Sequence, residues 1–296
     1  MPERILITGA TGHLGSRLAA RASAAGWSVT GTYLRAAPEA PGTVSAAWVR
    51  QPGVRDLRAK GSWERLDVRD GAAVRELVRR VRPDVIVHAA AGRDDWRVIA
   101  DGAAQVAVAA AAYGSRLVHV SSDAVFSGRE IEYDESAPPD PLYRYGAAKA
   151  AAETAIAAVD PGAVVVRTSL ILGGGDGQHE IQVRELIAGR AGGALFTDMI
   201  RTPVHVDDLA AALLELAGGD YHGILNVTGP DPINRYDLGV LVARRMGLDP
   251  ALIPVSTLAE SGLRLAADVR LLTTRATALL HTRLRSVHEF MSAPGE

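Results

Sequence analysis

Tyr145 and Lys149 are the two side chains in this sequence best suited to proton transfer. They lie four residues apart in a stretch that reads as a helix, residues 143–159, so both would lie on one face. A phenol has a pKa of about 10 and is a poor acid at neutral pH, but a lysine one turn away stabilises the phenolate. The pair could therefore donate a proton to a ketone or remove one from an alcohol. The same spacing also arises by chance in many helices.

Ser121 and Ser122 follow an apolar run at residues 117–120 that reads as a buried strand. Parallel sheets bind ligands at the carboxyl ends of their strands. A serine hydroxyl at this place could hold a substrate oxygen. Capping of the loop is the alternative interpretation.

A glycine-rich turn between a buried strand and a helix would position a cofactor beside these groups. In residues 5–18, ILITGATGHLGSRL, Gly9 allows a tight turn, Gly12 lets a pyrophosphate approach the backbone and Gly15 lets helix and strand pack closely. The first N–H groups of the helix then face the anion. Glycine spacing alone also fits an ordinary tight turn, but the flanking strand and helix favour a dinucleotide site.

The end of the second strand, residues 29–33, bears on which nicotinamide cofactor is used. NAD sites usually place an acid there for the ribose 2′-OH, whereas this chain has Thr32, Tyr33, Leu34 and then Arg35. A missing acid and a nearby guanidinium suit a 2′-phosphate. We therefore predict NADP(H) over NAD(H), the alternative being that Arg35 is a solvated surface residue.

Strands and helices alternate up to residue 172, which predicts an α/β fold with a doubly wound parallel sheet. Asp67, at the end of the third strand, could accept a hydrogen bond from an adenine amino group. Ala89, Ala90 and Ala91 are small enough for a dinucleotide to lie against the backbone, and we interpret His88 as a packed polar residue. We expect strands at residues 63–68, 84–92, 117–120 and 163–169, a small edge strand at 45–49, and helices at 72–81, 98–113 and 143–159.

The alternation stops after residue 172, at the glycine-rich loop GGGDGQ. We expect a helix at 181–188, a strand at 202–206, a helix capped by Asp207 or Asp208 and ending at 216, a strand at 224–227 and a helix at 236–246. We also expect a loop at 130–142, and short helices and loops in the last ~45 residues. We expect a dinucleotide-binding domain at 1–172, with 203–228 returning to it, and a smaller, mainly substrate-binding lobe at 173–296.

The composition excludes several classes of function. Hydrophobic residues make up 48% of the 296 residues, so a sizeable core is available. A net charge of -2 indicates neither nucleic-acid nor anionic-membrane binding. There are no cysteines and no run of membrane-spanning length. Because the N-terminus leads directly into a predicted strand, we expect no signal peptide. We expect a cytoplasmic protein, and no required metal because no acidic or histidine cluster has ligand spacing.

Five motifs in order resemble the extended short-chain dehydrogenase/reductase superfamily over nearly the whole chain. Within it, VSSDAVFSG, PLYRYGAAKAAAE and RTPVHVDDLA are most similar to dTDP-4-dehydrorhamnose reductases, and equally to the regulatory β-subunit of methionine adenosyltransferase. The five motifs are TGATGHLG (8–15), HAAAG (88–92), VSSDAVFSG (120–128), YGAAK (145–149) and RTPVHVDDLA (201–210).

The resemblance implies roles for individual residues. It makes Ser122, Tyr145 and Lys149 the catalytic triad, with Ser122, Asp123 and Arg201 contacting the substrate; Arg201 could equally be a surface residue. The residues implied to hold NADP(H), besides Tyr145 and Lys149, are Gly9, Thr11, Gly12, His13, Leu14, Gly15, Tyr33, Arg35, Asp67, Val68, Ala89, Ala90, Ala91 and Arg93.

Three positions depart from the family pattern. Asp101 lies near the place of a usual asparagine, which could disturb a proton relay. Ala266 stands where the proline of the family's Arg-Pro pair is expected, which bears on the substrate more than on the cofactor. Ser122-Asp123-Ala124 replaces the Thr-Asp-Glu of sugar-nucleotide dehydratases, and the missing glutamate argues against dehydration.

Three functions follow as hypotheses. The first is an NADPH-dependent reductase of a keto sugar nucleotide, with Tyr145 as proton donor. The second is an NADP(H)-binding regulatory subunit without chemistry, and the third a reductase of a non-sugar carbonyl. An epimerase is disfavoured because the acid at the end of the second strand is missing. By analogy with relatives, a homodimer is expected.

Overall fold

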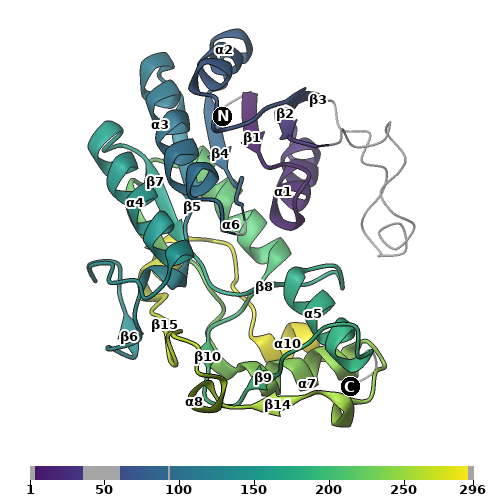
Figure 1. Ribbon diagram of the computed structural model, residues 1–296. Coiled ribbons are helices and arrows are strands. Elements are labelled where there is room, and N and C mark those ends of the chain that lie inside the picture. Colours follow the sequence, from purple (N-terminus) through teal and green to yellow (C-terminus); the bar gives the residue numbers. More distant parts are fainter. Residues whose placement is uncertain (1–3, 36–60, 93, 293–296) are drawn as a thin grey trace. The chain divides into compact units, whose positions relative to one another are not determined.

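The computed structural model describes residues 4–35, 61–92 and 94–292 (Figure 1). The chain divides into two compact units whose segments alternate along the sequence. Unit 1 comprises Met1–Ser121, Ala148–Val166 and Ala210–Ile224, and unit 2 comprises Ser122–Ala147, Arg167–Leu209 and Leu225–Glu296. The predicted strand at 45–49 and the predicted cofactor residue Arg93 lie outside the described residues.

A seven-stranded sheet forms the framework of unit 1 and confirms the predicted doubly wound α/β fold. The parallel register joins Ile5 to both Val29 and Val85, and Val118 to Val164. The strand order is β12-β7-β5-β4-β1-β2-β3. The bounds are β1 Arg4–Thr8, β2 Ser28–Tyr33, β3 Gly61–Arg65, β4 Val85–His88, β5 Arg116–Val120, β7 Val164–Arg167 and β12 Gly223–Asn226.

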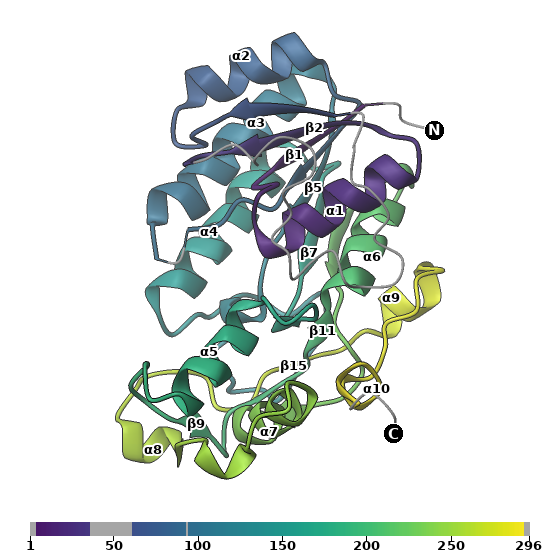
Figure 2. The same cartoon turned by 90° about the vertical axis from the view of Figure 1, so that its right-hand side faces the viewer.

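Helices cover both faces of this sheet (Figures 1 and 2). α1 (His13–Ala24) and α6 (Val206–Gly218) lie on one face. α2 (Gly71–Val81), α3 (Gly102–Tyr113) and α4 (Arg144–Val159) lie on the other. Their apolar residues bury a continuous core with alternate residues of the strands, among them Leu6, Ile86, Leu117 and Val165. Burial on both faces explains the uninterrupted apolar runs in these strands.

Two local signals set the ends of α2 and α3. Asp70 caps α2 by accepting hydrogen bonds from the N–H groups of Ala72 and Ala73. α3 is preceded by a π-helical turn, Arg97–Asp101, so the predicted helix at 98–113 has two parts. Asp101 is the last residue of that turn and is exposed.

Unit 2 packs three helices around its own apolar core, which includes Leu172, Val183, Leu238 and Phe290. The helices are α5 (Gln178–Ile187), α7 (Arg235–Arg245) and α10 (Val287–Met291). The remaining elements are short: β6 Glu132–Tyr133, β8 Ile171–Leu172, β9 Leu195–Phe196, β10 Ile200–Arg201, β11 Val204–His205, β13 Ile233–Asn234, β14 Val255–Ser256, α8 Leu258–Ser261, β15 Arg270–Leu271 and α9 Thr274–Leu279.

These short strands pair segments that are distant in sequence, as β6 does with β15 and β9 with β14. The predicted loop at 130–142 therefore contains a strand. Of the predicted strand at 202–206, Val204–His205 is a strand, β11, and α6 begins at Val206. The predicted cap of α6 is wrong. The helix begins at Val206, and the Asp208 carboxylate binds the guanidinium and N–H of Arg285. That partner lies 77 residues further along the chain.

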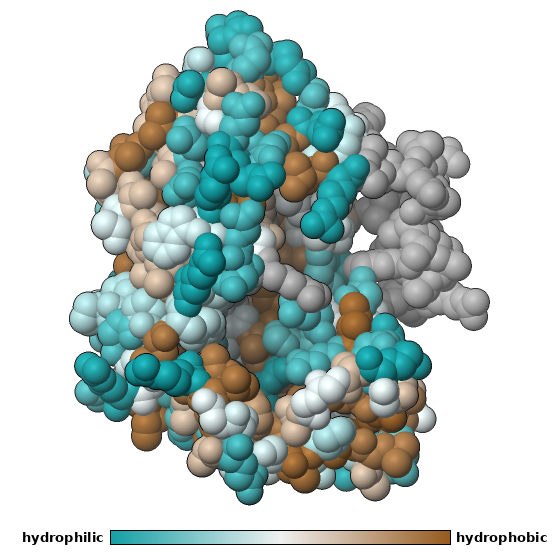
Figure 3. Space-filling model, in the orientation of Figure 1, coloured by the Kyte–Doolittle hydropathy of each residue, from teal (hydrophilic) through white to brown (hydrophobic). Residues whose placement is uncertain are grey.

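The surface of unit 2 carries several large apolar side chains, of which Leu252, Val255 and Leu263 are each more than half exposed. Figure 3 shows hydrophobic patches among hydrophilic side chains in the region that Figure 1 labels α8 and β14. Among the residues described, no helix combines the length and apolar character needed to cross a lipid bilayer.

Candidate active site

The glycine turn between β1 and α1 has no room for side chains at two positions. Gly9 has a φ of +72°, and a Cβ there would lie 2.7 Å from the Cα of Ala90. A Cβ on Gly15 would lie 2.2 Å from the carbonyl oxygen of Gly9. Gly12 is the N-cap residue of α1, and its own N–H donates to that same oxygen at 3.0 Å. The turn is therefore a cradle of backbone atoms at a helix N-terminus, which suits a pyrophosphate.

Thr32 fixes this turn against the end of β2, a role that the sequence pattern did not reveal. Its hydroxyl accepts from the N–H of Gly9 at 3.2 Å, and its carbonyl accepts from the N–H of Ala10 at 3.1 Å. Tyr33 is half-buried and Arg35 is exposed. Arg35 is therefore accessible to an anion. This exposure fits both interpretations of Arg35, as a contact to a 2′-phosphate and as a solvated surface residue.

Asp67 and Val68 are placed differently from each other. The guanidinium of Arg69 holds both carboxylate oxygens of Asp67, with its Nη2 at 2.7 Å from Oδ2. The hydrogen bond from the Arg69 side chain lowers the pKa of Asp67. The side chain of Val68 is part of the unit 1 core. An adenine amino group would share Asp67 with Arg69, and Val68 could offer only its backbone.

His88 is packed beneath the turn. Its Nδ1 lies 2.6 Å from the hydroxyl of Thr8, and its ring stacks on His119 with centroids 5.2 Å apart. Burial lowers the pKa of His88 to about 3, so the ring is neutral at pH 7. Ala89 and Ala90 follow at the strand end and are half-buried.

Ser122 and Tyr145 are brought together within unit 2. Ser122 caps a short 3₁₀ turn by accepting from the N–H of Ala124 at 3.2 Å. It also hydrogen-bonds to the phenol of Tyr145, which lowers the pKa of Tyr145, while burial raises it by more. The net shift is upward, so Tyr145 is a protonated phenol at neutral pH. Gly146 permits this approach, because a Cβ there would lie 2.0 Å from the carbonyl oxygen of Ala124.

Asp123 and Arg201, both predicted to contact substrate, are buried in unit 2 and bound to other groups. Asp123 accepts from the hydroxyl of Ser169 at 2.5 Å, and its Oδ2 lies 3.6 Å from Nε of Arg201. The Nη atoms of Arg201 donate to the carbonyls of Ile200 and Ala266. Arg201 is only 5% exposed and so is not a surface residue. Ala266, noted as a departure from the family pattern, supplies one of its acceptors.

Arg235 is a second buried guanidinium near this cluster. It was not predicted as a site residue, because it opens an amphipathic helix and reads as an ordinary helix residue. It bonds to neutral groups, His179 Nδ1 at 3.1 Å and Gln182 Oε1 at 2.8 Å. Burial, and next the charge of Arg201, lower its pKa to about 10. The charge of Asp123 works against this shift.

Lys149 belongs to unit 1, although it lies one turn after Tyr145 on α4. It is 3% exposed, and its Nζ donates to the carbonyl of Val120 at 2.8 Å. Burial lowers its pKa to about 8, and the charge of Glu153 works against that shift. The Ser121 hydroxyl donates a hydrogen bond to Glu153 of α4 at 2.5 Å. The neighbouring Ser122 hydroxyl instead hydrogen-bonds to Tyr145. Sequence reasoning did not single out Glu153, although its place four residues after Lys149 was a usable signal.

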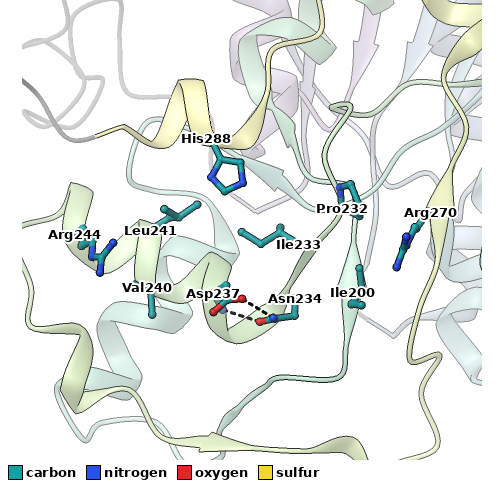
Figure 4. Close-up of a pocket in the computed structure, with 10 residues that line it drawn as sticks. All are labelled: Ile200, Pro232, Ile233, Asn234, Asp237, Val240, Leu241, Arg244, Arg270 and His288. Carbon is teal, nitrogen blue, oxygen red and sulfur yellow. Dashed lines mark hydrogen bonds between the residues drawn. The ribbon is translucent and has the colours of Figure 1, made fainter. Parts of the chain in front are cut away.

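A separate pocket of about 530 Å³ lies in unit 2 beside α7 (Figure 4). Asn234 and Asp237 hydrogen-bond to each other at its edge. Its lining includes none of the predicted site residues and consists of Ile200, Pro232, Ile233, Asn234, Asp237, Val240, Leu241, Arg244, Arg270 and His288. Within residues 4–35, 61–92 and 94–292, no group of three or more acidic or histidine side chains could hold a metal ion.

Known proteins are similar to this chain along most of its length. The family model described as RmlD substrate binding domain matches residues 3–291. The dTDP-4-dehydrorhamnose reductase of Mycobacterium tuberculosis is 33% identical over 273 residues, covering 86% of this chain and 80% of the relative. The methionine adenosyltransferase 2 subunit beta of Rattus norvegicus is 28% identical over 265 residues, covering 83% and 73%.

A solved structure gives the same fold. The dTDP-4-dehydrorhamnose reductase of Bacillus anthracis, crystallised in complex with NADP, matches with a TM-score of 0.77 at 23% identity over 98% of both chains. The predicted resemblance to extended short-chain dehydrogenases/reductases is confirmed, and the chain belongs to the RmlD substrate binding domain family.

Proposed function

We propose that this protein is an NADPH-dependent reductase of the keto group of a sugar nucleotide. The observation that carries the proposal is the hydrogen bond between Ser122 and the Tyr145 phenol, with Lys149 one turn further along the same helix. The similarity to dTDP-4-dehydrorhamnose reductases supports the substrate class.

The cofactor follows from the cradle at Gly9, Gly12 and Gly15. The close-packed glycine turn at the N-terminus of α1 fits a pyrophosphate, and Arg35 with the missing acid favours the 2′-phosphate of NADP(H). When bound, NADPH supplies a hydride to the carbonyl carbon. In this proposal residues 1–172, with 203–228, bind the cofactor, and residues 173–296 contribute most of the substrate site.

The residues of the chain then handle the proton. Ser122 holds the carbonyl oxygen by a hydrogen bond, and Tyr145 donates its phenolic proton to that oxygen as the carbon accepts the hydride, which completes the alcohol. Tyr145 is protonated at neutral pH because burial raises its pKa, and this is the state that reduction needs. Lys149 stabilises the phenolate that remains.

The test measures NADPH oxidation by purified protein with a dTDP-4-keto-6-deoxysugar. Tyr145→Phe should lower kcat by about 100-fold or more, since general acid catalysis contributes at least that much. Tyr143→Phe is the matched control, because the Tyr143 ring stacks on Tyr145 at 6.4 Å but has no role in the proposed chemistry. Oxidation that is unchanged by Tyr145→Phe would overturn the mechanism.

The similarity to methionine adenosyltransferase 2 subunit beta favours a second candidate, an NADP(H)-binding regulatory subunit. Tight binding of NADP without turnover across a panel of keto sugar nucleotides, together with co-purification of a larger enzyme, would support it over the first. Turnover of a non-sugar ketone in the same assay would instead point to a reductase of a different substrate class.

A further inference from the structure

The inner face of α4 carries two charged residues where apolar ones would be expected. Its buried residues include Ala148, Lys149, Ala152, Glu153 and Ile156, which recur at helical spacing and face the sheet. Lys149 is 3% and Glu153 6% exposed. A buried pair of opposite charges is seldom retained for stability alone, because the cost of removing both from water offsets their attraction.

The end of β5 holds both side chains by hydrogen bonds from neighbouring residues. The carbonyl of Val120 accepts from Lys149 Nζ at 2.8 Å, and the hydroxyl of Ser121 donates to Glu153 Oε1 at 2.5 Å. Ser121 is itself fixed, because its N–H donates to the carbonyl of Val166 at 2.7 Å. The Glu153 carboxylate is therefore anchored in one place beside the helix turn that bears Lys149.

The other titratable groups around Lys149 do not favour its charge. His88 on β4 and His119 on β5 are fully buried, and the charge of Lys149 helps to lower the pKa of both. Tyr145, one turn earlier on α4, is a neutral phenol. The charge of Glu153, by contrast, raises the pKa of Lys149.

We propose that Glu153 is a positioning residue that keeps Lys149 protonated, and that Ser121 fixes the Glu153 carboxylate for this purpose. The inference deepens the proposed reductase function and rests on it, since a protonated Lys149 is what stabilises the phenolate of Tyr145. Glu153 acts through Lys149 and contacts neither the substrate nor the cofactor in this scheme.

The number of lysines makes a direct test practical. Lys60 and Lys149 are the two lysines of the sequence, so protein carrying ¹³C-labelled lysine gives two side-chain signals, and Lys60→Arg identifies them. We expect the Lys149 signal to titrate with a midpoint near the pKa of about 8. Glu153→Gln should lower that midpoint by about one pH unit, because one nearby negative charge is lost. Glu153→Asp keeps the negative charge, so the Lys149 midpoint should stay close to the wild-type value. Ser121→Ala should lower the Lys149 midpoint by a smaller but measurable amount.

Enzyme assays and melting temperatures complete the test. In Glu153→Gln the alkaline limb of the pH profile of kcat/KM should move down with the Lys149 midpoint, while Glu153→Asp keeps the wild-type limb. A Lys149 midpoint that is the same in wild type, Glu153→Gln and Ser121→Ala, with only the melting temperature lowered, would show a purely structural role and overturn the inference. If Glu153→Gln does not fold, an unchanged midpoint in Ser121→Ala overturns it alone.

Failure of the proposed function gives a different result. Wild-type protein that turns over no keto sugar nucleotide contradicts the reductase assignment, whatever the lysine signal does. A midpoint that falls in Glu153→Gln supports the coupling of Glu153 to Lys149 in either case, because the titration needs no substrate.

Discussion

The buried His88 should make the protein sensitive to mild acid, and His88→Asn should remove a defined part of that sensitivity. Burial lowers the folded-state pKa of His88 from 6.5 to about 3. Below pH 6.5 the unfolded chain therefore binds the His88 proton and the folded chain does not, so stability falls as the pH falls. Asparagine keeps a polar atom near the hydroxyl of Thr8, which lies 2.6 Å from His88 Nδ1.

The size of the effect follows from the same shift. Each pH unit between the two pKa values costs about 1.4 kcal/mol. Lowering the pH from 7 to 5 should thus remove about 2 kcal/mol of the free energy of unfolding through His88 alone. Burial also pushes the pKa of His119 well below its usual value. His119 is present in both proteins, but its ring stacks on His88, so the difference between them reports the loss of His88 together with its effect on His119.

Urea unfolding, followed by circular dichroism at pH 5, 6 and 7, measures this difference. The wild type should lose about 2 kcal/mol more than His88→Asn over that range. His288→Asn, at an exposed histidine, is the control and should follow the wild type. Equal pH dependence in wild type and His88→Asn would refute the reasoning from burial.

Two further changes test the cofactor site. Arg35→Ala should raise the Kd for NADPH by about ten- to a hundredfold and leave that for NADH nearly unchanged, since a charge-assisted bond to the 2′-phosphate is lost; equal effects on both would contradict the NADP(H) assignment. Gly15→Ala places a Cβ 2.2 Å from the Gly9 carbonyl oxygen and should lower both the melting temperature and NADPH affinity, measured by fluorescence titration. Gly12→Ala, where the nearest atom is 3.2 Å away, is its control for stability and should melt close to wild type.

The sequence predicted unit 1 well because its signals are local. β4 and β5 are short apolar runs bounded by turn residues, and α2 begins after Asp70 and buries Val74, Leu77 and Val78 at helical spacing. The glycine turn is likewise contained in one stretch of chain. Each of these features depends on residues within a few positions of one another, so one sequence suffices to find them.

Unit 2 was predicted less well because its structure depends on distant partners. β6 pairs with β15 across more than a hundred residues, and each strand is two residues long, too short to leave a pattern. Asp208 was predicted to cap a helix, but its carboxylate accepts hydrogen bonds from the guanidinium of Arg285. No local rule could identify such a partner.

The supporting residues of the candidate site were missed for a related reason. Thr32, Glu153 and Arg235 act through groups that folding brings to them: the N–H of Gly9, the hydroxyl of Ser121, and the side chains of His179 and Gln182. Taken alone, each reads as an ordinary strand or helix residue. Motif resemblance names the residues that do chemistry, whereas Thr32 and Arg235 become visible only from their contacts; Glu153 had one signal in the sequence, its place four residues after Lys149.

The alternation of the two units has a consequence for synthesis of the chain on the ribosome. Each unit is built from three separate segments, so the chain passes between the units five times. β7 lies between β5 and β12 in the sheet, and its second edge stays open until residues 223–226 have been made. An open strand edge invites wrong pairing with other chains. A fragment that stops before residue 223 would keep the glycine turn but expose that edge permanently. A fragment long enough to include β12 also carries the unit 2 segments Ser122–Ala147 and Arg167–Leu209, so no single cut in this gene separates the complete sheet from unit 2.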